Sequence, residues 1–483
     1  MGDPVFKEGS YNQISRLSLR NDIVTQPVNK ESMKSHLEKD WTEGNIISNL
    51  MMLSWPVIIS QSLNMIGPTI DLIWVGRLGD TAIAAVGVAG MAIMFVMSAM
   101  MGLSQGTRAM VSRFVGSGDM AGANNAAIQS FNICACYSII MVSIGILFSD
   151  KILMILGVSS GVIIEGAAYM RIMFIGSGVR SFRMMTGSVM QASGDAITPM
   201  KIVFILRVIH VIICPFLIFG WWIAPQMGVS GAALANVISQ GIGLLLDIMV
   251  FFSMRTRIFL KLKDFKIDLH MMWRIVRIGI PASVMGMQRG LSQLLLMALM
   301  VPFGTTAVAA HTILQRLEMI MAMVCLGIGI GAGTLAGQNL GAGKPHRAEK
   351  SGLYACGIAE IIMIFSSALF FIWPQYAIRI FSSDPELVKI SSMFLRIAVV
   401  GFTVMGLGPV FMQFFSGAGD TMFPMLVSLF NTWLILLPAA YLLPKITGMG
   451  VFGIRWAMAG SMILPGIAYV IYFKMGKWKE KAV

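Results

Sequence analysis

Charged residues are scarce in this chain of 483 residues, of which only 12% are Asp, Glu, Lys or Arg. Hydrophobic residues make up 56%, and the mean hydropathy is +0.77. A soluble protein cannot cover its surface with so few charges. The composition therefore excludes a soluble protein and predicts an integral membrane protein.

Histidine and cysteine are also rare, with five residues of each. The histidines are scattered, at His36, His210, His270, His311 and His346. A membrane-embedded enzyme needs several His, Asp or Glu side chains at one depth, so we expect no enzyme. The cysteines lie in apolar stretches and lack the paired spacing of a metal site. We therefore expect free thiols, no metal site and no cofactor besides a coupling ion. These thiols are Cys134, Cys136, Cys214, Cys325 and Cys356.

Acidic residues are fewer than basic ones, and the formal net charge is +13. The basic residues do not alternate with aromatic residues on a soluble module, which excludes nucleic acid as a partner. They gather between the two halves of the chain and near its end, and the positive-inside rule places both segments in the cytoplasm. Residues 1–45 contain no apolar stretch, so we expect a cytoplasmic tail without a cleavable signal peptide. We thus expect both termini on the cytoplasmic side of the cell membrane. The basic residues concerned are Arg255, Arg257, Lys261, Lys263, Lys266, Arg274, Arg277, Lys474, Lys477, Lys479 and Lys481.

Long apolar stretches fill the rest of the chain. About 20 apolar residues span a bilayer, and twelve stretches are long enough to do so. Alternating short strands of the barrel type are absent, so the spans must satisfy their backbone groups within helices. The sequence predicts an all-α membrane protein with twelve transmembrane helices, near 47–73, 82–106, 123–147, 163–190, 199–219, 229–253, 275–300, 305–332, 349–373, 388–414, 423–444 and 450–473.

The chain is a duplication with an offset of 225 residues. Pro56 matches Pro281 and Gly79 matches Gly304, and many later Gly, Asp and Pro positions keep this register. Because six spans per half is an even number, the two six-helix lobes should be parallel repeats, related by an axis along the membrane normal. We predict lobes at 46–253 and 275–473, a basic cytoplasmic linker at 254–274, and tails at 1–45 and 474–483.

Three kinds of turn recur in both halves. The first outer turns end at Gly79 and Gly304, where we expect positive φ and a threonine cap from Thr81 or Thr306 on the next helix. Glycine-rich turns follow the second span, and Gly-Asp turns that lead into a proline follow the fourth. A phosphate-binding loop is excluded, since the glycine-rich turns lack a preceding strand and a Walker lysine context. The later turns are at 116–118, 341–343, 194–199 and 419–424.

In this paired order, the turns resemble those of the multidrug and toxic compound extrusion (MATE) family, over about residues 40–475. The resemblance implies two six-helix lobes that export cationic or amphiphilic compounds against an inward flow of protons or sodium ions. It also implies that an aspartate in the first helix belongs to a cation site of the N-terminal lobe. Its usual partners are an Asn and an Asp, four residues apart in the fifth helix and just before a proline.

Asp71 is the first candidate for ion coupling, because it lies within the first apolar stretch. An ionised carboxylate there must be paired, hydrated or neutralised. The alternative is that Asp71 reaches the outer interface or pairs with Arg77. Gln61 and Asn64 share its helical face and are candidates for lining a cavity.

Pro56 and Pro68 interrupt the same predicted helix, and we expect them to act as hinges. The fifth span departs from the family pattern, since His210 and Cys214 stand at the partner positions before Pro215. Sodium prefers oxygen ligands, so nitrogen and sulfur weaken a sodium site. Histidine titrates near neutral pH and favours a proton couple with Asp71. A neutral His210 that is hydrogen-bonded within the bundle is the alternative.

The second half lacks a matching acid, because Leu296 occupies the position of Asp71. Its candidate cavity residues are Gln288 in the seventh span and His311, Gln315 and Glu318 on one face of the eighth. Arg316 could balance the charge of Glu318, and a structural role for Glu318 stays open. Tyr169 and Asn236 complete the candidate cavity residues. The sequence leaves open whether five arginines reach an interface or face the cavity: Arg171, Arg180, Arg183, Arg207 and Arg396.

We therefore expect a monomeric antiporter for lipophilic or cationic organic compounds, coupled through Asp71 to protons rather than sodium ions. Two alternatives remain: a flippase for lipid-linked sugars, which favours a basic cavity, and a membrane receptor that keeps a transporter fold.

Overall fold

The computed structural model describes residues 39–155, 157–221, 225–253, 256–258 and 266–481. The chain divides into two units, Met1–Lys39 and Asp40–Val483, and every described helix belongs to the second. Most of the predicted N-terminal tail, through residue 38, lies outside the described residues. So do positions 254–255 and 259–265 of the predicted linker and the last two residues of the C-terminal tail.

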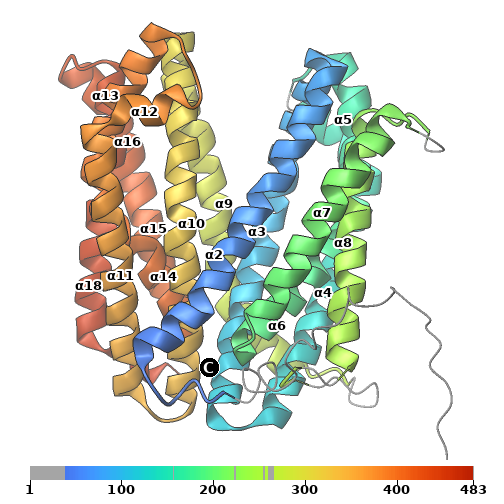
Figure 1. Cartoon of the computed structure of the whole chain (residues 1–483), viewed down its shortest axis with the longest axis vertical. Coiled ribbons are helices and arrows are strands. Elements are labelled where there is room, and N and C mark those ends of the chain that lie inside the picture. Colours follow the sequence, from blue (N-terminus) through green and yellow to red (C-terminus); the bar gives the residue numbers. More distant parts are fainter. Residues whose placement is uncertain (1–38, 156, 222–224, 254–255, 259–265, 482–483) are drawn as a thin grey trace, which may run out of the picture. The chain divides into compact units, whose positions relative to one another are not determined.

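The described residues form helices and turns, with no strand among them, which confirms the predicted all-helical fold. Figure 1 shows the helices of the two repeats as two groups within Asp40–Val483. The first repeat comprises α2 (Ile46–Val75), η1 (Gly76–Leu78), α3 (Asp80–Ser117), α4 (Met120–Ile155), α5 (Ser160–Ile175), α6 (Ser177–Ser193), α7 (Ile197–Phe219) and α8 (Val229–Phe252). The second comprises α9 (Leu269–Met300), η3 (Val301–Phe303), α10 (Thr305–Gly341), α11 (Pro345–Ile372), α12 (Pro374–Arg379), α13 (Pro385–Phe402), α14 (Leu407–Gly417), α15 (Met422–Phe430), η4 (Asn431–Leu436), α16 (Leu437–Ile446), α17 (Val451–Ser461), α18 (Ile463–Met475) and η5 (Lys477–Glu480).

The number of spans depends on how two bent pairs of helices are counted. Among the described residues, ten helices are long and apolar enough to cross a membrane without a sharp bend. α5 with α6 and α13 with α14 pass the same test as pairs, bent by 43° and 44°. Counting each pair as one span gives the predicted twelve.

The two repeats differ in how continuous their helices are. α4 is a single helix, but its counterpart breaks at Trp373 and continues as the short α12, which begins at Pro374. α7 is also single, whereas its counterpart contains a π-helical stretch, η4, between α15 and α16. Such π-helical stretches are often found at functional sites.

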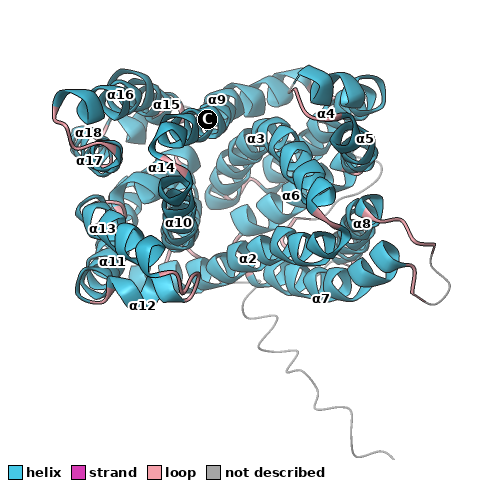
Figure 2. Ribbon diagram, turned by 90° about the horizontal axis from the view of Figure 1, so that it is seen from above, coloured by secondary structure: helices cyan, strands magenta, loops and turns pink. Residues whose placement is uncertain are grey.

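Glycines bring the two lobes into close contact in a symmetric way. A Cβ at Gly102 in α3 would collide with Ser283 of α9, and one at Gly327 in α10 would collide with Ile58 of α2. Both the glycines and their partners are 225 residues apart in the sequence. The duplication therefore extends from the sequence to the interface, where α3 packs on α9 and α10 packs on α2 (Figure 2).

Two hydrogen bonds join the lobes near the same end of the bundle. Arg113 Nη2 donates to the carbonyl of Ala418 at 3.1 Å, and Gln338 Nε2 donates to the carbonyl of Ala192 at 2.8 Å. Arg113 and Gln338 are also 225 residues apart. Each donor satisfies a carbonyl at the C-terminal end of a helix in the other lobe. These bonds lie at the end where α2 begins and α3 ends, which the sequence predicts to be cytoplasmic.

The turn glycines adopt the predicted positive φ, with 115° at Gly79 and 95° at Gly304. The expected threonine caps are wrong, however. These glycines are themselves the N-cap residues of α3 and α10, and neither helix has a side-chain cap. The chain already turns at the glycine, so Thr81 and Thr306 fall inside the helices.

Candidate functional site

Asp71 is buried in the first lobe, with 4% of its surface exposed. Nε2 of His210 lies 3.0 Å from its Oδ1, and the Cys214 thiol donates to the same oxygen at 3.4 Å. One turn of α7 separates His210 from Cys214, so both side chains reach α2 from the same helical face. The structure thus brings together the three residues that the sequence singled out for ion coupling.

The alternative positions for Asp71 are wrong. The carboxylate is buried and so does not reach an interface, and the guanidinium of Arg77 lies 4.7 Å from the centre of the Trp74 ring. Tyr169 of α5 is buried beside the site and interacts electrostatically with Asp71. Asp71 is therefore held among α2, α5 and α7.

His210 is fully buried, yet neither ring nitrogen has an aligned hydrogen-bond partner among the described residues. The 3.0 Å distance to Asp71 meets the criterion for an ion pair, but the orientation does not suit a hydrogen bond. We give more weight to the distance, because a small rotation of the ring would align it. The alternative of a neutral His210 held by hydrogen bonds within the bundle is not what the structure contains. An unsatisfied buried polar group points to a role other than packing.

The donor set of this site limits the ions that it can hold. It offers one carboxylate oxygen, one imidazole nitrogen and one sulfur atom, all within 4.8 Å of one another. Sodium is a hard cation that prefers several oxygen ligands, so this set suits it poorly. A carboxylate and an imidazole in contact can share and exchange a proton.

Asn64 holds Arg207 of α7 in place one helical face away from Asp71. Arg207 Nη2 donates to Asn64 Oδ1 at 3.0 Å, and its guanidinium lies directly against Gly67 of α2, where a Cβ would overlap it. Pro68 lies between this contact and Asp71 in the sequence. A bend of α2 at Pro68 would therefore move Asp71 relative to the position that holds Arg207.

The arginines that the sequence left open lie inside the first lobe. Arg183 Nε donates to Gln240 at 2.6 Å, and Arg180 interacts electrostatically with Tyr137 and Tyr169 on α4 and α5. Arg207 interacts with both of these arginines. Arg180 is solvent-accessible, and no ion pair or hydrogen bond of Arg180 occurs among the described residues. The interior of this lobe is therefore positively charged, with Asp71 and Asp247 as the nearby carboxylates.

The second lobe has its own charged cluster. Arg455 of α17 donates to Glu318 Oε1 at 2.6 Å and lies 3.2 Å from Nδ1 of His311. The expectation that Arg316 balances Glu318 is wrong, because Arg316 faces outward and is exposed. Arg455 was missed, although a lone arginine in an apolar stretch was itself a signal of a buried partner.

The other candidate cavity residues are not gathered at one place. Gln288 of α9 donates to the Ser428 hydroxyl of α15. Gln61, Asn236 and Gln315 are half-buried. In the parts of the chain that the structure describes, no hydrogen bond joins any of these three to another candidate.

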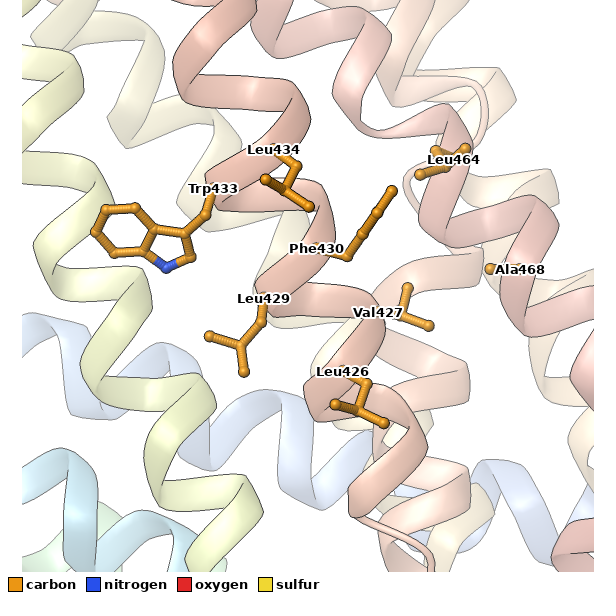
Figure 3. A pocket seen from close by; sticks show the side chains of 8 residues that line it. All are labelled: Leu426, Val427, Leu429, Phe430, Trp433, Leu434, Leu464 and Ala468. Carbon is orange, nitrogen blue, oxygen red and sulfur yellow. The ribbon is translucent and has the colours of Figure 1, made fainter.

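An apolar pocket of about 680 Å³ lies beside the π-helical stretch of the second lobe (Figure 3). Leu426, Phe430 and Trp433 line it from α15 and η4, and Leu464 and Ala468 line it from α18. It contains none of the polar candidates. The sequence gave no sign of it, because apolar side chains are common throughout the chain.

Comparison with known proteins gives a consistent result across sequence and fold. The family model MatE matches residues 56–216 and 281–442, two blocks that begin 225 residues apart. The chain is similar to a probable multidrug resistance protein, YpnP, of Bacillus subtilis, with 25% identity over 91% of this chain and 97% of the relative. It is also similar to the multidrug export protein MepA of Staphylococcus aureus, with 23% identity over 88% and 93%.

Solved structures share the fold. An outward-facing multidrug resistance MATE family transporter of the MOP superfamily superimposes with a TM-score of 0.84 and 23% identity, over 92% of this chain and 98% of that one. A MOP superfamily transporter from Pyrococcus furiosus gives a TM-score of 0.84 with 22% identity, over 92% and 98%.

Proposed function

The chain belongs to the MATE family of membrane transporters, and from this we propose that it is a secondary active antiporter that exports lipophilic or cationic organic compounds in exchange for protons. Protons enter through Asp71 and His210, and sodium coupling is the less favoured alternative. Multidrug transport is also the activity in the names of its relatives. We place the protein in the cell membrane as a monomer, with both termini in the cytoplasm.

The observation that carries this proposal is the buried contact between Asp71 and His210. A charged carboxylate inside a membrane protein is expensive unless a partner compensates it. The compensating group here is a histidine, whose charge can change near neutral pH. The pair can therefore hold or release a proton without leaving an uncompensated charge in the interior.

The cycle follows from the position of Pro68. A proton bound at Asp71 neutralises the carboxylate and weakens its attraction to His210. α2 can then bend where Pro68 removes a backbone hydrogen bond. Asn64 and Gly67, on the other side of Pro68, shift with the helix, and Arg207 loses its position. Substrate release and proton uptake are linked by this displacement.

The test uses purified protein in vesicles on which proton and sodium gradients are imposed separately. A proton gradient should drive efflux of a lipophilic dye, and Asp71→Asn should abolish it at equal protein content. Efflux driven by sodium at clamped pH, with no response to protons, would contradict the proposal.

A second candidate function is the transfer of anionic amphiphiles, including the flippase activity for lipid-linked sugars. The observation that favours it is the positive interior of the first lobe, where Arg180, Arg183 and Arg207 lie together. Two dyes with the same aromatic body, one carrying a sulfonate and one a quaternary ammonium, distinguish the two functions. Preferred transport of the sulfonate would support the second candidate over the first.

A further inference from the structure

A basic pocket of about 310 Å³ lies between α12 and the first half of α13 in the second lobe. Its polar lining includes three cations and no carboxylate. These side chains are Gln375, Arg379, Ser383, Lys389, Ser392 and Arg396. The pocket is remote in sequence from the ion-coupling residues, and its function does not depend on theirs.

The duplication shows that this pocket is specific to the second lobe. In the first lobe, Arg171 forms an ion pair with Asp150. At the same offset of 225 residues, Arg396 corresponds to Arg171, but Gln375 stands in place of the acid. The second copy has therefore kept the arginine and lost the charge that would balance it.

Two further positions differ in the same direction. Arg379 corresponds to Met154 of the first lobe, and Lys389 corresponds to Ile164. Positive charge has thus accumulated at one place in one repeat. A requirement of the fold would apply to both lobes, so the difference points to a ligand of this lobe.

The polar groups of the pocket lack partners within the protein. Among the described residues, no ion pair involves Arg379, Lys389 or Arg396. Ser392 is 7% exposed, and its hydroxyl has no hydrogen-bond partner there. A buried hydroxyl that faces three unpaired cations is ready to bind an anion.

The nearest acids do not neutralise these cations. Asp384 is the N-cap of α13, where its Oδ1 accepts a hydrogen bond from the backbone N–H of Glu386 at 3.0 Å. Neither acid lines the pocket. Both are exposed to solvent, which screens their charges.

The location of the pocket indicates the source of the anion. α12 and α13 meet at the end of the second lobe opposite to the end where α2 begins (Figure 1). Next to the pocket, Trp373 is 53% exposed and Tyr376 is 69% exposed. Exposed Trp and Tyr at the end of a transmembrane helix are typical of the headgroup region of a bilayer.

We propose that this pocket binds the phosphate group of an anionic phospholipid headgroup. Arg379 and Arg396 hold the phosphate oxygens with their guanidinium groups, Lys389 adds a third positive charge, and the Ser392 hydroxyl donates a hydrogen bond. The lipid tails lie against the exposed apolar surface of the adjoining helices. Free phosphate shares the chemistry of the headgroup but would not use the interfacial position.

The test measures lipid binding to the full-length protein in detergent by native mass spectrometry. Short-chain phosphatidylglycerol, phosphatidylcholine and inorganic phosphate are the three probes. One phosphatidylglycerol should remain bound at concentrations where phosphatidylcholine does not, and excess inorganic phosphate should fail to displace it. Arg396→Gln should weaken this binding by about ten- to a hundredfold, as expected for the loss of a charged hydrogen bond.

Two variants separate a binding site from a structural role. Gln375→Asp recreates the acid of the first lobe, so it should compete with the lipid for Arg396 without removing any cation. Arg171→Gln, the counterpart in the first lobe, should leave lipid binding unchanged. Equal affinity for both lipids, displacement by inorganic phosphate, or unchanged binding in both Arg396→Gln and Gln375→Asp would overturn the proposal. Because no transport is measured, these outcomes do not depend on the proposed antiport.

Discussion

Nε2 of His210 on α7 lies 3.0 Å from Oδ1 of Asp71 on α2, and both side chains are buried. The contact joins the two helices that differ most in their freedom to bend, since α2 contains two prolines in its interior and α7 contains one near its end. A change of charge at this contact is therefore transmitted to the shape of α2. The account of proton coupling depends on this relationship.

Replacing His210 by Gln should remove the titrating partner of Asp71 while keeping a polar side chain of similar length. We expect efflux in vesicles to lose its dependence on pH near neutrality. Cys214→Ser is the matched control, because it keeps a hydrogen-bond donor one turn away on the same helix. If His210→Gln kept the wild-type pH profile, the histidine would have no part in coupling.

Gly67→Ala should displace the guanidinium of Arg207, which occupies the space that the new methyl group needs. We expect a loss of about 1–3 kcal/mol in stability, as for other overpacked sites. Gly187→Ala is the control, since no atom lies within 4 Å of a Cβ at that position. Thermal unfolding in detergent measures both variants, and equal unfolding temperatures would show that Arg207 has room elsewhere.

Arg455 and Glu318 form a pair in which the arginine is 1% exposed and the glutamate 15%. Removing one partner leaves a charge buried in the second lobe. Arg455→Met or Glu318→Gln should each cost about 3 kcal/mol of stability, and the double variant should cost less than the sum. Arg316→Met tests the neighbouring arginine, which is exposed and should change stability by less than about 0.5 kcal/mol. Additive losses in the double variant would mean that the two charges do not interact.

Arg113 and Gln338 hold the lobes together at the end predicted to be cytoplasmic. Arg113→Ala or Gln338→Ala should each shift the protein toward the state in which this end is open. A lost hydrogen bond is worth about 1 kcal/mol, which is about a fivefold change in population. Distances between spin labels on α6 and α10 would report the shift, and identical distance distributions in both variants would exclude a role for these bonds in gating.

Asp268 gives a prediction for acid conditions, since it lies outside the spans as the N-cap of α9. Hydrogen bonds from the Met271 backbone N–H and the Asn125 side chain hold the pKa of its carboxyl below the usual range. The ionised carboxylate therefore stabilises the fold above a pH of about 4, and this contribution is lost as the pH falls through the lowered pKa. Asn125→Ala should lower the unfolding temperature at pH 7 and have a smaller effect at low pH. The same effect at both pH values would exclude the charge of Asp268 as the cause.

The sequence predicted the helical fold, the duplication and the meeting of Asp71 with His210 and Cys214. Regular spacing carried these predictions, because a fixed offset or a single helical turn determines which residues align. The pairing of Arg455 with Glu318 could not be predicted. It depends on the rotation of α17 against α10, and the two residues are 137 positions apart. The break at Trp373 and the π-helical stretch at 431–436 arise from packing between helices, which a single sequence does not record.

The most direct test of proton coupling is the release of protons when substrate binds to the purified protein in weakly buffered detergent solution. An antiporter binds the two in competition, so addition of a lipophilic dye should release protons from the wild-type protein and none from Asp71→Asn. Dye binding without proton release, or the same release from Asp71→Asn, would contradict the account.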